Sequence, residues 1–312
     1  MTTTDLSTEQ HREATARRLL QSSVDRNYDP SVDLDWSAPI DPAVSFHPPE
    51  LTTLYGTDLW DELTAEQQHK LGRLEQGWTA SQGIIAEIGL MTMLLRVGTM
   101  DPRTLHGQYA LTELADECRH STMFSRGLET MRQPGDPQIP TLPPVVALVA
   151  RVLGALISDS PTGWSALLYV EDTLDKLQRE TMRDERLQPL VRMINRIHVT
   201  EEARHMSYAR EELDRSMVGR SRRSLALHRA LTGLMVLASS RLVVPGFVYA
   251  EVGLDPERAV PTAWNNPHRQ ANAKRHAERY IKTMEEAGLI VGRISQSLWS
   301  RSGLRPVEGV SQ

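Results

Sequence analysis

Residues 198–205 read HVTEEARH, which places two histidines and two glutamates within eight positions. The flanking segments, LVRMINRI and MSYAREEL, contain neither glycine nor proline, so the whole stretch is predicted to be one helix. Residues at positions i, i+4 and i+7 lie on one face of a helix. His198, Glu202 and His205 have this spacing and therefore point the same way, whereas Glu201 and Arg204 are rotated off that face.

A second octet, ELADECRH at residues 113–120, resembles the first. Residues 116–120 and 201–205 share the pattern acid-Glu-x-Arg-His. Two Glu-x-x-His pairs on two separate helices are the known ligand arrangement of a dinuclear, carboxylate-bridged metal site in a four-helix bundle. Such a site also requires one inward-facing glutamate from each of the two remaining helices.

The chain supplies both of the required glutamates. Glu87 is the only charged residue between positions 82 and 95, and it lies in the apolar stripe of its helix. Glu171 has leucines on its own face, whereas Asp172 falls on a more polar face with Asp175 and Lys176. On spacing alone, the predicted metal ligands are Glu87, Glu117, His120, Glu171, Glu202 and His205.

The chemistry of these side chains indicates which ions they would bind. Carboxylate oxygens and imidazole nitrogens suit iron or manganese. Four carboxylates facing one apolar core would repel one another and be costly to desolvate without a metal, but they offset the charge of two divalent ions. A lone Glu-x-x-His pair usually belongs to a solvated helix face. Two such motifs together with two isolated core glutamates favour a metal site.

Asp116 and Glu201 directly precede the ligand glutamates of the two motifs. Histidines that bind a metal usually donate their second ring N–H to a carboxylate, and we assign this supporting role to both acids. The alternative is a surface ion pair of each acid with Arg119 or Arg204.

Two other residues of the first motif are less informative. Glu113 shares the helix face of Glu117 and is a weaker candidate for a supporting role. Cys118 is one residue from Glu117, so it is turned away from the metals and is expected to be a small buried residue.

Composition limits the class of protein. The chain has 312 residues, 40% of them hydrophobic, and a formal charge of −5, which predicts a soluble globular protein without a nucleic-acid partner. The single cysteine excludes an internal disulfide and fits the cytoplasm. The N-terminus lacks the apolar core of a secretory signal. Two apolar stretches are interrupted by Arg151, or by Arg241 and Pro245, so no membrane partner is expected.

The remaining pattern predicts an all-α fold, a ferritin-like four-helix bundle core with additional N- and C-terminal helices. Residues 1–61 are expected to form an N-terminal helix and an irregular arm, and residues 62–312 a single di-iron bundle domain with its ligands between positions 87 and 205. Helices are predicted at about 65–100, from 101–102 to about 134, after 143–144, after 161–163 to about 184, and at about 187–217, 221–242 and 267–287.

The six ligands resemble those of the ferritin-like di-iron carboxylate superfamily, and His198 narrows the resemblance. A seventh ligand that gives His-x-x-x-Glu-x-x-His on the last ligand helix is similar to the p-aminobenzoate N-oxygenase family of arylamine oxygenases. In this chain the three positions are His198, Glu202 and His205. The resemblance extends from about residue 87 to 209.

This resemblance implies an enzyme in which two iron ions, rather than manganese, use O₂ to oxidise an aromatic amine. The product would be a hydroxylamine, a nitroso or a nitro compound. Electrons would come from an external reductase or reductant, because the sequence has no dinucleotide fingerprint and too few cysteines for an iron–sulfur cluster. Members of the family are usually homodimers that act in bacterial natural-product pathways such as antibiotic biosynthesis.

Other functions of the same metal cage remain open. The radical-generating subunit of ribonucleotide reductase has a tyrosine four residues after the first histidine, where this chain has Phe124. A hydroxylase or an acyl carrier desaturase lacks a histidine equivalent to His198. A ferroxidase or iron-binding protein would have no organic substrate, whereas about a hundred residues follow the last ligand here.

The amine itself is not readable from the sequence. A free aminobenzoate would need a cation across the pocket from the metals, and a carrier-bound amine would need an open channel. Spacing does not choose among the arginines that are available for the first case, which are Arg96, Arg119, Arg204, Arg210 and Arg275.

Overall fold

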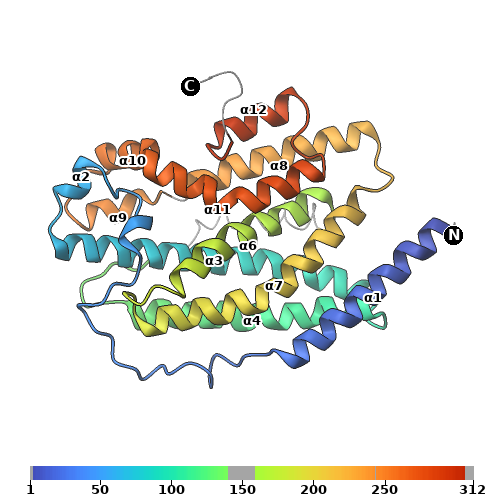
Figure 1. The fold of residues 1–312 in the computed structure, drawn as a ribbon, viewed down its shortest axis with the longest axis horizontal. Helices are drawn as coiled ribbons and strands as arrows, with labels where there is room; N and C mark the ends of the chain where they lie inside the picture. Colours follow the sequence, from blue (N-terminus) through green and yellow to red (C-terminus); the bar gives the residue numbers. More distant parts are fainter. Residues whose placement is uncertain (1–2, 140–158, 243, 306–312) are drawn as a thin grey trace.

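Four long helices form a bundle at the centre of the computed structural model, which describes residues 3–139, 159–242 and 244–305 (Figure 1). They are α3 (Ala65–Met100), α4 (Leu105–Met131), α6 (Pro161–Thr181) and α7 (Pro189–Met217). Helix α3 packs along α4, and α6 packs along α7. Within the described ranges the only β-type pairing is an isolated bridge between Ser45 and Leu187. The prediction of an all-α, ferritin-like bundle is therefore confirmed.

Three of the four bundle helices begin where a side chain accepts a hydrogen bond from a free N–H group of the first turn, whereas α7 starts with Pro189 and has no side-chain cap. Thr64 and Gln67 form a reciprocal capping box at the start of α3. Thr104 caps α4, and Ser160 caps α6, which begins with Pro161 at its first position. The predicted boundary after 161–163 was therefore slightly late, because the proline is part of the first turn.

The turn between α3 and α4 explains why the second predicted helix starts at Leu105 and not at 101–102. The N–H of Thr104 donates to the carbonyl of Asp101 over 3.2 Å, which closes a tight turn. A Cβ atom on Gly107 would lie 2.3 Å from the same carbonyl oxygen, so only glycine fits. The helix that was predicted after 143–144 lies outside the described residues.

A second layer of helices covers one side of the bundle (Figure 1, orange to red). Helices α8 (Arg222–Leu242) and α11 (Pro267–Glu286) pack against α6, and α12 (Arg293–Arg301) packs against α8. The short helices α9 (Gly246–Ala250) and α10 (Pro256–Asn265) connect α8 to α11, with α10 adjoining both α9 and α11. These two and α12 were not anticipated individually, because they are too short to show a periodic pattern.

The N-terminal part of the chain reaches both ends of the bundle. Helix α1 (Thr3–Asp25) packs on α4 and α7, where Arg12 makes two hydrogen bonds of 2.9 and 3.0 Å to Glu212. The arm that follows contains a short 3₁₀ helix, η1 (Pro49–Leu51), and α2 (Asp58–Asp61). Asn266, the N-cap of α11, donates to the carbonyls of Thr53 and Tyr55, both over 2.9 Å. The arm is therefore tied to the second layer.

Two helices are long and apolar enough to cross a membrane by length and composition, Ala65–Met100 and Arg222–Ala250. This is weak evidence for a membrane span, because core helices of soluble proteins meet the same criteria. Helix α3 buries the charged residues Glu75 and Glu87 in its interior face, as a core helix can when polar partners surround it.

Candidate metal centre

The four bundle helices turn seven titratable side chains into one buried cluster. Glu87 comes from an apolar stretch of α3, and Glu171 comes from α6, where it follows the apolar run Ala166–Val170. Helix α4 contributes one Glu-x-x-His pair, and α7 contributes three residues from successive turns of one face. No residue of the cluster is more than 3% exposed, and its members are Glu87, Glu117, His120, Glu171, His198, Glu202 and His205.

Two overlapping sets of donor atoms lie within this cluster, and in each set all atoms are within 4.8 Å of one another. The first set consists of Glu87, His120, His198 and Glu202. The second set consists of Glu117, His120, Glu202 and His205. The two sets overlap at His120 and Glu202, so they offer two adjacent cation positions. The Glu202 carboxylate has two oxygens and could bridge two ions, whereas the single lone pair of His120 Nδ1 could serve only one of them.

Two of the histidines direct Nδ1 toward the carboxylates. His120 Nδ1 lies 3.0 Å from Glu202 Oε1 and 3.1 Å from Glu117 Oε2. His205 Nδ1 lies 2.7 Å from Glu117 Oε1 and 3.0 Å from Glu202 Oε2. The two Glu-x-x-His motifs thus converge on the same pair of carboxylates from facing helices.

His198 enters the cluster with its other ring nitrogen. Its Nε2 lies 3.1 Å from Glu87 Oε1 and 3.5 Å from Glu202 Oε1. Its Nδ1 lies 2.7 Å from the side-chain oxygen of Gln178, which fixes the ring and leaves Nε2 free to accept a cation. Sequence reasoning missed Gln178. The available signal was its position two turns after Glu171 on the same face of α6.

Asp116 and Glu201 each lie beside the outward-facing ring nitrogen of a clustered histidine. Glu201 Oε2 lies 2.8 Å from His120 Nε2, and Asp116 Oδ2 lies 3.4 Å from His205 Nε2. Both acids are buried. The ion pairs that were considered as the alternative are also present, because Asp116 accepts from Arg119 and, over 3.0 Å, from Arg204.

The electrostatics of the cluster fit a pair of cations. Burial raises the pKa of Glu87 well above its ordinary value, and repulsion from Glu117 adds to this effect. Burial likewise raises the pKa of Glu171, with further repulsion from Glu202. One buried oxygen of each, Glu87 Oε2 and Glu171 Oε2, has no hydrogen-bond partner among the described residues. Divalent ions would satisfy these oxygens and remove the repulsion.

The negative charge of the carboxylates also shifts the pKa values of two histidines. Burial lowers the pKa of His120 and His205, but hydrogen bonds and attraction from the surrounding carboxylates more than offset this, and both values rise well above the ordinary range. The protein therefore concentrates negative charge at this point. The oxygen and nitrogen donors suit iron or manganese.

Two residues of the first motif differ from expectation. Glu113 is fully buried, but neither of its oxygens has a hydrogen-bond partner among the described residues, so it does not support a ligand histidine by direct contact. Cys118 is turned away from the cluster as expected, but it is exposed and not buried. Its Sγ lies 3.3 Å from Met91 Sδ of α3, at the solvent-facing edge where the two helices meet.

Asp172 also differs from expectation. It was placed on a polar face, yet it is only 1% exposed. Arg210 and Arg279 lie 2.5 and 2.7 Å from its Oδ1, and these charge-assisted contacts make its burial possible.

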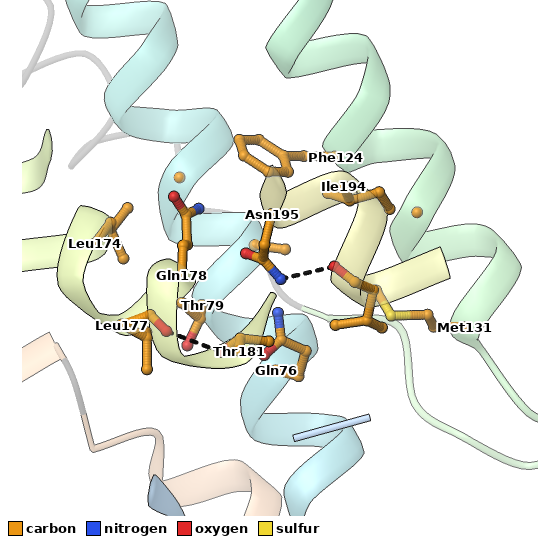
Figure 2. A pocket seen from close by; sticks show the side chains of 14 residues that line it. Gln76, Thr79, Phe124, Met131, Leu174, Leu177, Gln178, Thr181, Ile194 and Asn195 are labelled. Atoms are coloured by element: carbon orange, nitrogen blue, oxygen red, sulfur yellow. Dashed lines mark hydrogen bonds between the residues drawn. The ribbon is translucent and has the colours of Figure 1, made fainter. Parts of the chain in front are cut away.

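A small cavity lies inside the bundle, between α3, α4, α6 and α7 (Figure 2). Phe124, Gln178, Ile194 and Asn195 are among its lining residues, and the ring centroid of Phe124 is 4.8 Å from that of His198. Its volume is about 30 Å³, which holds about two water molecules. We call it the inner cavity.

A larger cavity of about 340 Å³ lies between α3, α6, α8 and α11, and we call it the outer cavity. Its size is typical of a site for a small organic molecule. Thr79, Gly83, Leu174 and Leu177 line both cavities, so the two are neighbours. None of the five arginines considered from the sequence is among the lining residues of either cavity, whereas Arg269 lines the outer one.

Comparisons with known proteins find curated relatives and one family model that resemble this chain. An "Uncharacterized protein MT0908" of Mycobacterium tuberculosis (strain CDC 1551 / Oshkosh) is 28% identical over 250 residues, 77% of this chain and 72% of that protein. An "Uncharacterized protein Mb0909" of Mycobacterium bovis (strain ATCC BAA-935 / AF2122/97) is 30% identical over 203 residues, 62% of this chain and 58% of that protein. The model of the family described as "P-aminobenzoate N-oxygenase AurF" matches residues 9–288. The chain thus belongs to the p-aminobenzoate N-oxygenase family.

Proposed function

We propose that this chain is a di-iron, O₂-dependent N-oxygenase that oxidises an aromatic amine to a hydroxylamine, nitroso or nitro product. Membership of the family and the buried carboxylate–histidine cluster indicate an oxygenase with a two-metal site. The observation that supports the specific reaction best is the position of His198, which adds a third imidazole to the cluster in the sequence pattern of the arylamine oxygenases.

The seven clustered residues would hold the two ions. Ferrous ions bound there would supply the electrons with which O₂ is first reduced. The chain itself orients the three histidine rings. Glu201, Asp116 and Gln178 each contact the ring nitrogen that faces away from the metal-binding glutamates. Burial of the cluster keeps bulk water from the reaction.

The substrate and the partners belong to the same proposal. The outer cavity favours an organic substrate over a ferroxidase role, because a protein that only oxidises iron needs no cavity of about 340 Å³. We infer that electrons come from an external reductase or reductant. We further propose a cytoplasmic homodimer that acts in natural-product biosynthesis.

A single-turnover experiment tests the reaction. The protein is loaded with ferrous iron and exposed to ¹⁸O₂ with a panel of arylamines that includes p-aminobenzoate, and products are followed by mass spectrometry. We expect ¹⁸O on the amine nitrogen. If the iron oxidises and every amine returns unchanged, the N-oxygenase proposal fails, and a hydroxylase, a desaturase or a ferroxidase remains.

His198→Ala tests the residue on which the proposal depends. We expect a folded protein with weaker or altered iron binding and no oxygenated amine, because one donor and its orienting contact with Gln178 are lost. His228→Ala is the matched control: His228 is also buried, but it contacts Thr162 outside the cluster. Full activity in His198→Ala would remove the main support for the proposal.

A further inference from the structure

The N-terminal arm contacts the outer side of the metal centre just after α1 ends. The N–H of Tyr28 donates to Glu201 Oε1 over 3.1 Å. The other oxygen of this carboxylate lies 2.8 Å from Nε2 of His120. Glu201 itself is fully buried. One carboxylate thus connects a backbone group of the arm with a predicted metal ligand.

A second contact of the arm runs through Arg204, which is only 5% exposed. Its Nη1 donates to the carbonyl of Arg26 over 2.9 Å, and its Nη2 donates to Asp116 Oδ2 over 3.0 Å. The same carboxylate oxygen lies 3.4 Å from Nε2 of His205. The arm therefore also reaches the histidine of the second Glu-x-x-His motif through one acid.

Arg119 makes the third contact. It donates to Asn27 Oδ1 over 2.9 Å and also donates to Asp116. We call residues 26–28 the clamp segment. This segment presents oxygens to the two arginines and an N–H to Glu201, so each of its contacts joins groups of complementary polarity, and each involves one charged group.

Apolar packing keeps the arm on the bundle at the same place. Leu34 of the arm is only 4% exposed and belongs to a core cluster with Met123 and Phe124 of α4. Tyr28 and Trp36 pack against this cluster. The hydrogen bonds of the clamp segment therefore form in a part of the arm that burial of apolar surface already holds in place.

The clamp segment lies on the side of the bundle away from the second layer (Figure 1). Its hydrogen-bond partners belong to α4 and α7, whereas the outer cavity lies between α3, α6, α8 and α11. The arm and the outer cavity thus approach the metal cluster from different directions. A change in the clamp segment should act on the metal ligands without altering the walls of this cavity.

We propose that the clamp segment positions the metal ligands: it holds Asp116 and Glu201 in the orientation in which these acids fix His120 and His205. Metal binding and docking of the clamp segment then stabilise each other. The inference rests on the two-metal site of the proposed function and not on the oxidation of amines. Because coupling between two equilibria is reciprocal, a segment that raises the metal affinity must be stabilised by metal by the same factor.

Hydrogen exchange in the full-length wild type tests the effect of metal on the clamp segment. Exchange is compared between the metal-free protein and the protein loaded with ferrous iron without O₂, and single amides are resolved by mass spectrometry with fragmentation. We expect the N–H of Tyr28 to exchange about fivefold more slowly, or more slowly still, with iron bound. The N–H of Ser37 is the control, because it donates to Asp35 within the arm and should not change.

A pair of substitutions at Tyr28 tests the reverse effect. Tyr28→Ala removes the ring but keeps the N–H that Glu201 accepts, whereas Tyr28→Pro also removes the N–H. We expect Tyr28→Pro to bind ferrous iron about fivefold more weakly than Tyr28→Ala, or more weakly still, in competition with a chelator. Ser37→Pro is the matched control, since it removes an N–H bond inside the arm and should bind iron as the wild type does.

The two effects must occur together, and circular dichroism should show that all variants are folded. Unchanged exchange at Tyr28 on iron loading overturns the inference. Equal iron affinity in Tyr28→Pro and Tyr28→Ala, or an equal loss in Ser37→Pro, also overturns it. If both effects appear while the single-turnover experiment returns every amine unchanged, the inference stands and only the N-oxygenase reaction fails.

Discussion

His198 differs from the other two histidines of the cluster in the ring nitrogen that it presents. His120 and His205 direct Nδ1 toward the carboxylates, whereas His198 directs Nε2. A histidine that binds through Nε2 needs a partner for Nδ1, and Gln178 provides it from the neighbouring helix. The orientation of His198 is therefore set by α6 as much as by its own helix.

The contact with Gln178 can be tested by removing the amide. Gln178→Leu should weaken iron binding by about 10–100-fold, because His198 would lose the group that fixes its tautomer and ring plane. Competition with a chelator measures the affinity, and the visible spectrum of the iron-loaded protein reports the ligand field. Asn195→Leu is the control, since Asn195 lines the same inner cavity but donates to the carbonyl of Val191 in its own helix. Equal loss in both variants would argue against a specific role for Gln178.

At the residue scale, periodicity alone predicted which side chains share a helix face. The spacing of His198, Glu202 and His205 placed them together because a helix repeats every 3.6 residues. The structure brings six of the seven sequence-derived candidates into the two donor sets, and the seventh, Glu171, is buried and interacts with Glu202. Gln178 escaped prediction because its contact with His198 depends on how α6 packs on α7, and one sequence does not contain that information.

At the scale of the element, one face of α3 contributes both to the metal cluster and to the two cavities. It carries Glu87 into the cluster, and one turn earlier it leaves a gap at Gly83 that belongs to both cavities. A Cβ atom on Gly83 would lie 3.7 Å from the ring of Phe124, which is an ordinary contact. Alanine would therefore fit the backbone while taking space from both cavities.

Gly83→Ala should separate stability from activity. We expect the free energy of unfolding to rise by about 0.5–1 kcal/mol, because alanine is a better helix former than glycine. Binding and oxidation of arylamines should fall, since the methyl group enters the region shared by the cavities. Gly89→Ala is the control: no atom lies within 4 Å of its Cβ position, so it should gain stability without losing activity. If both variants retain the activity of the wild type, Gly83 does not face the substrate.

The boundaries of the elements were predictable where a capping residue or proline marks them. Helix α3 has the limits expected from the sequence, and Thr64 and Gln67 show why. Helix α4 starts later than expected because a turn closed by Thr104 and Gly107 precedes it. The short helices α9 and α10 were missed because their stability comes from packing and not from their own sequence pattern.

At the scale of the whole molecule, the second layer closes the outer cavity against the bundle. Helices α8 and α11 supply one wall of the outer cavity, and the N-terminal arm is bound to the same layer. Glu75 lies at the junction of the bundle, the arm and α9. It accepts hydrogen bonds from the N–H and hydroxyl of Thr53, and that hydroxyl lies 2.8 Å from the hydroxyl of Tyr249.

The buried carboxyl of Glu75 should make the free energy of unfolding depend on pH. Burial raises the pKa of Glu75 from 4.5 to about 7, so the folded chain keeps a proton that the unfolded chain loses. The contribution of this group to stability is therefore lost as pH rises from about 4.5 to about 7, by an amount on the order of 3 kcal/mol. Glu75→Gln should be more stable than the wild type at pH 8 and should lose this slope.

Urea unfolding at pH 5 to 8, in steps of about half a pH unit, measures how the free energy of unfolding changes with pH. Glu66→Gln on the same helix is the control, because Glu66 is exposed and its replacement should leave the slope unchanged. Parallel pH profiles for wild type and Glu75→Gln would contradict the prediction.

The unpaired carboxyl of Glu113 has a consequence for the symmetry of the centre. Helices α4 and α7 present the same Glu-x-x-His motif, and Glu113 precedes Glu117 by the interval at which His198 precedes Glu202. The two halves of the bundle are thus equivalent at every motif position except this one, where one half has an imidazole and the other a carboxyl. Two ions held between such halves would differ in nitrogen ligation, and hence in reduction potential. One exchanged side chain would be enough to make the two halves of a repeated architecture chemically distinct.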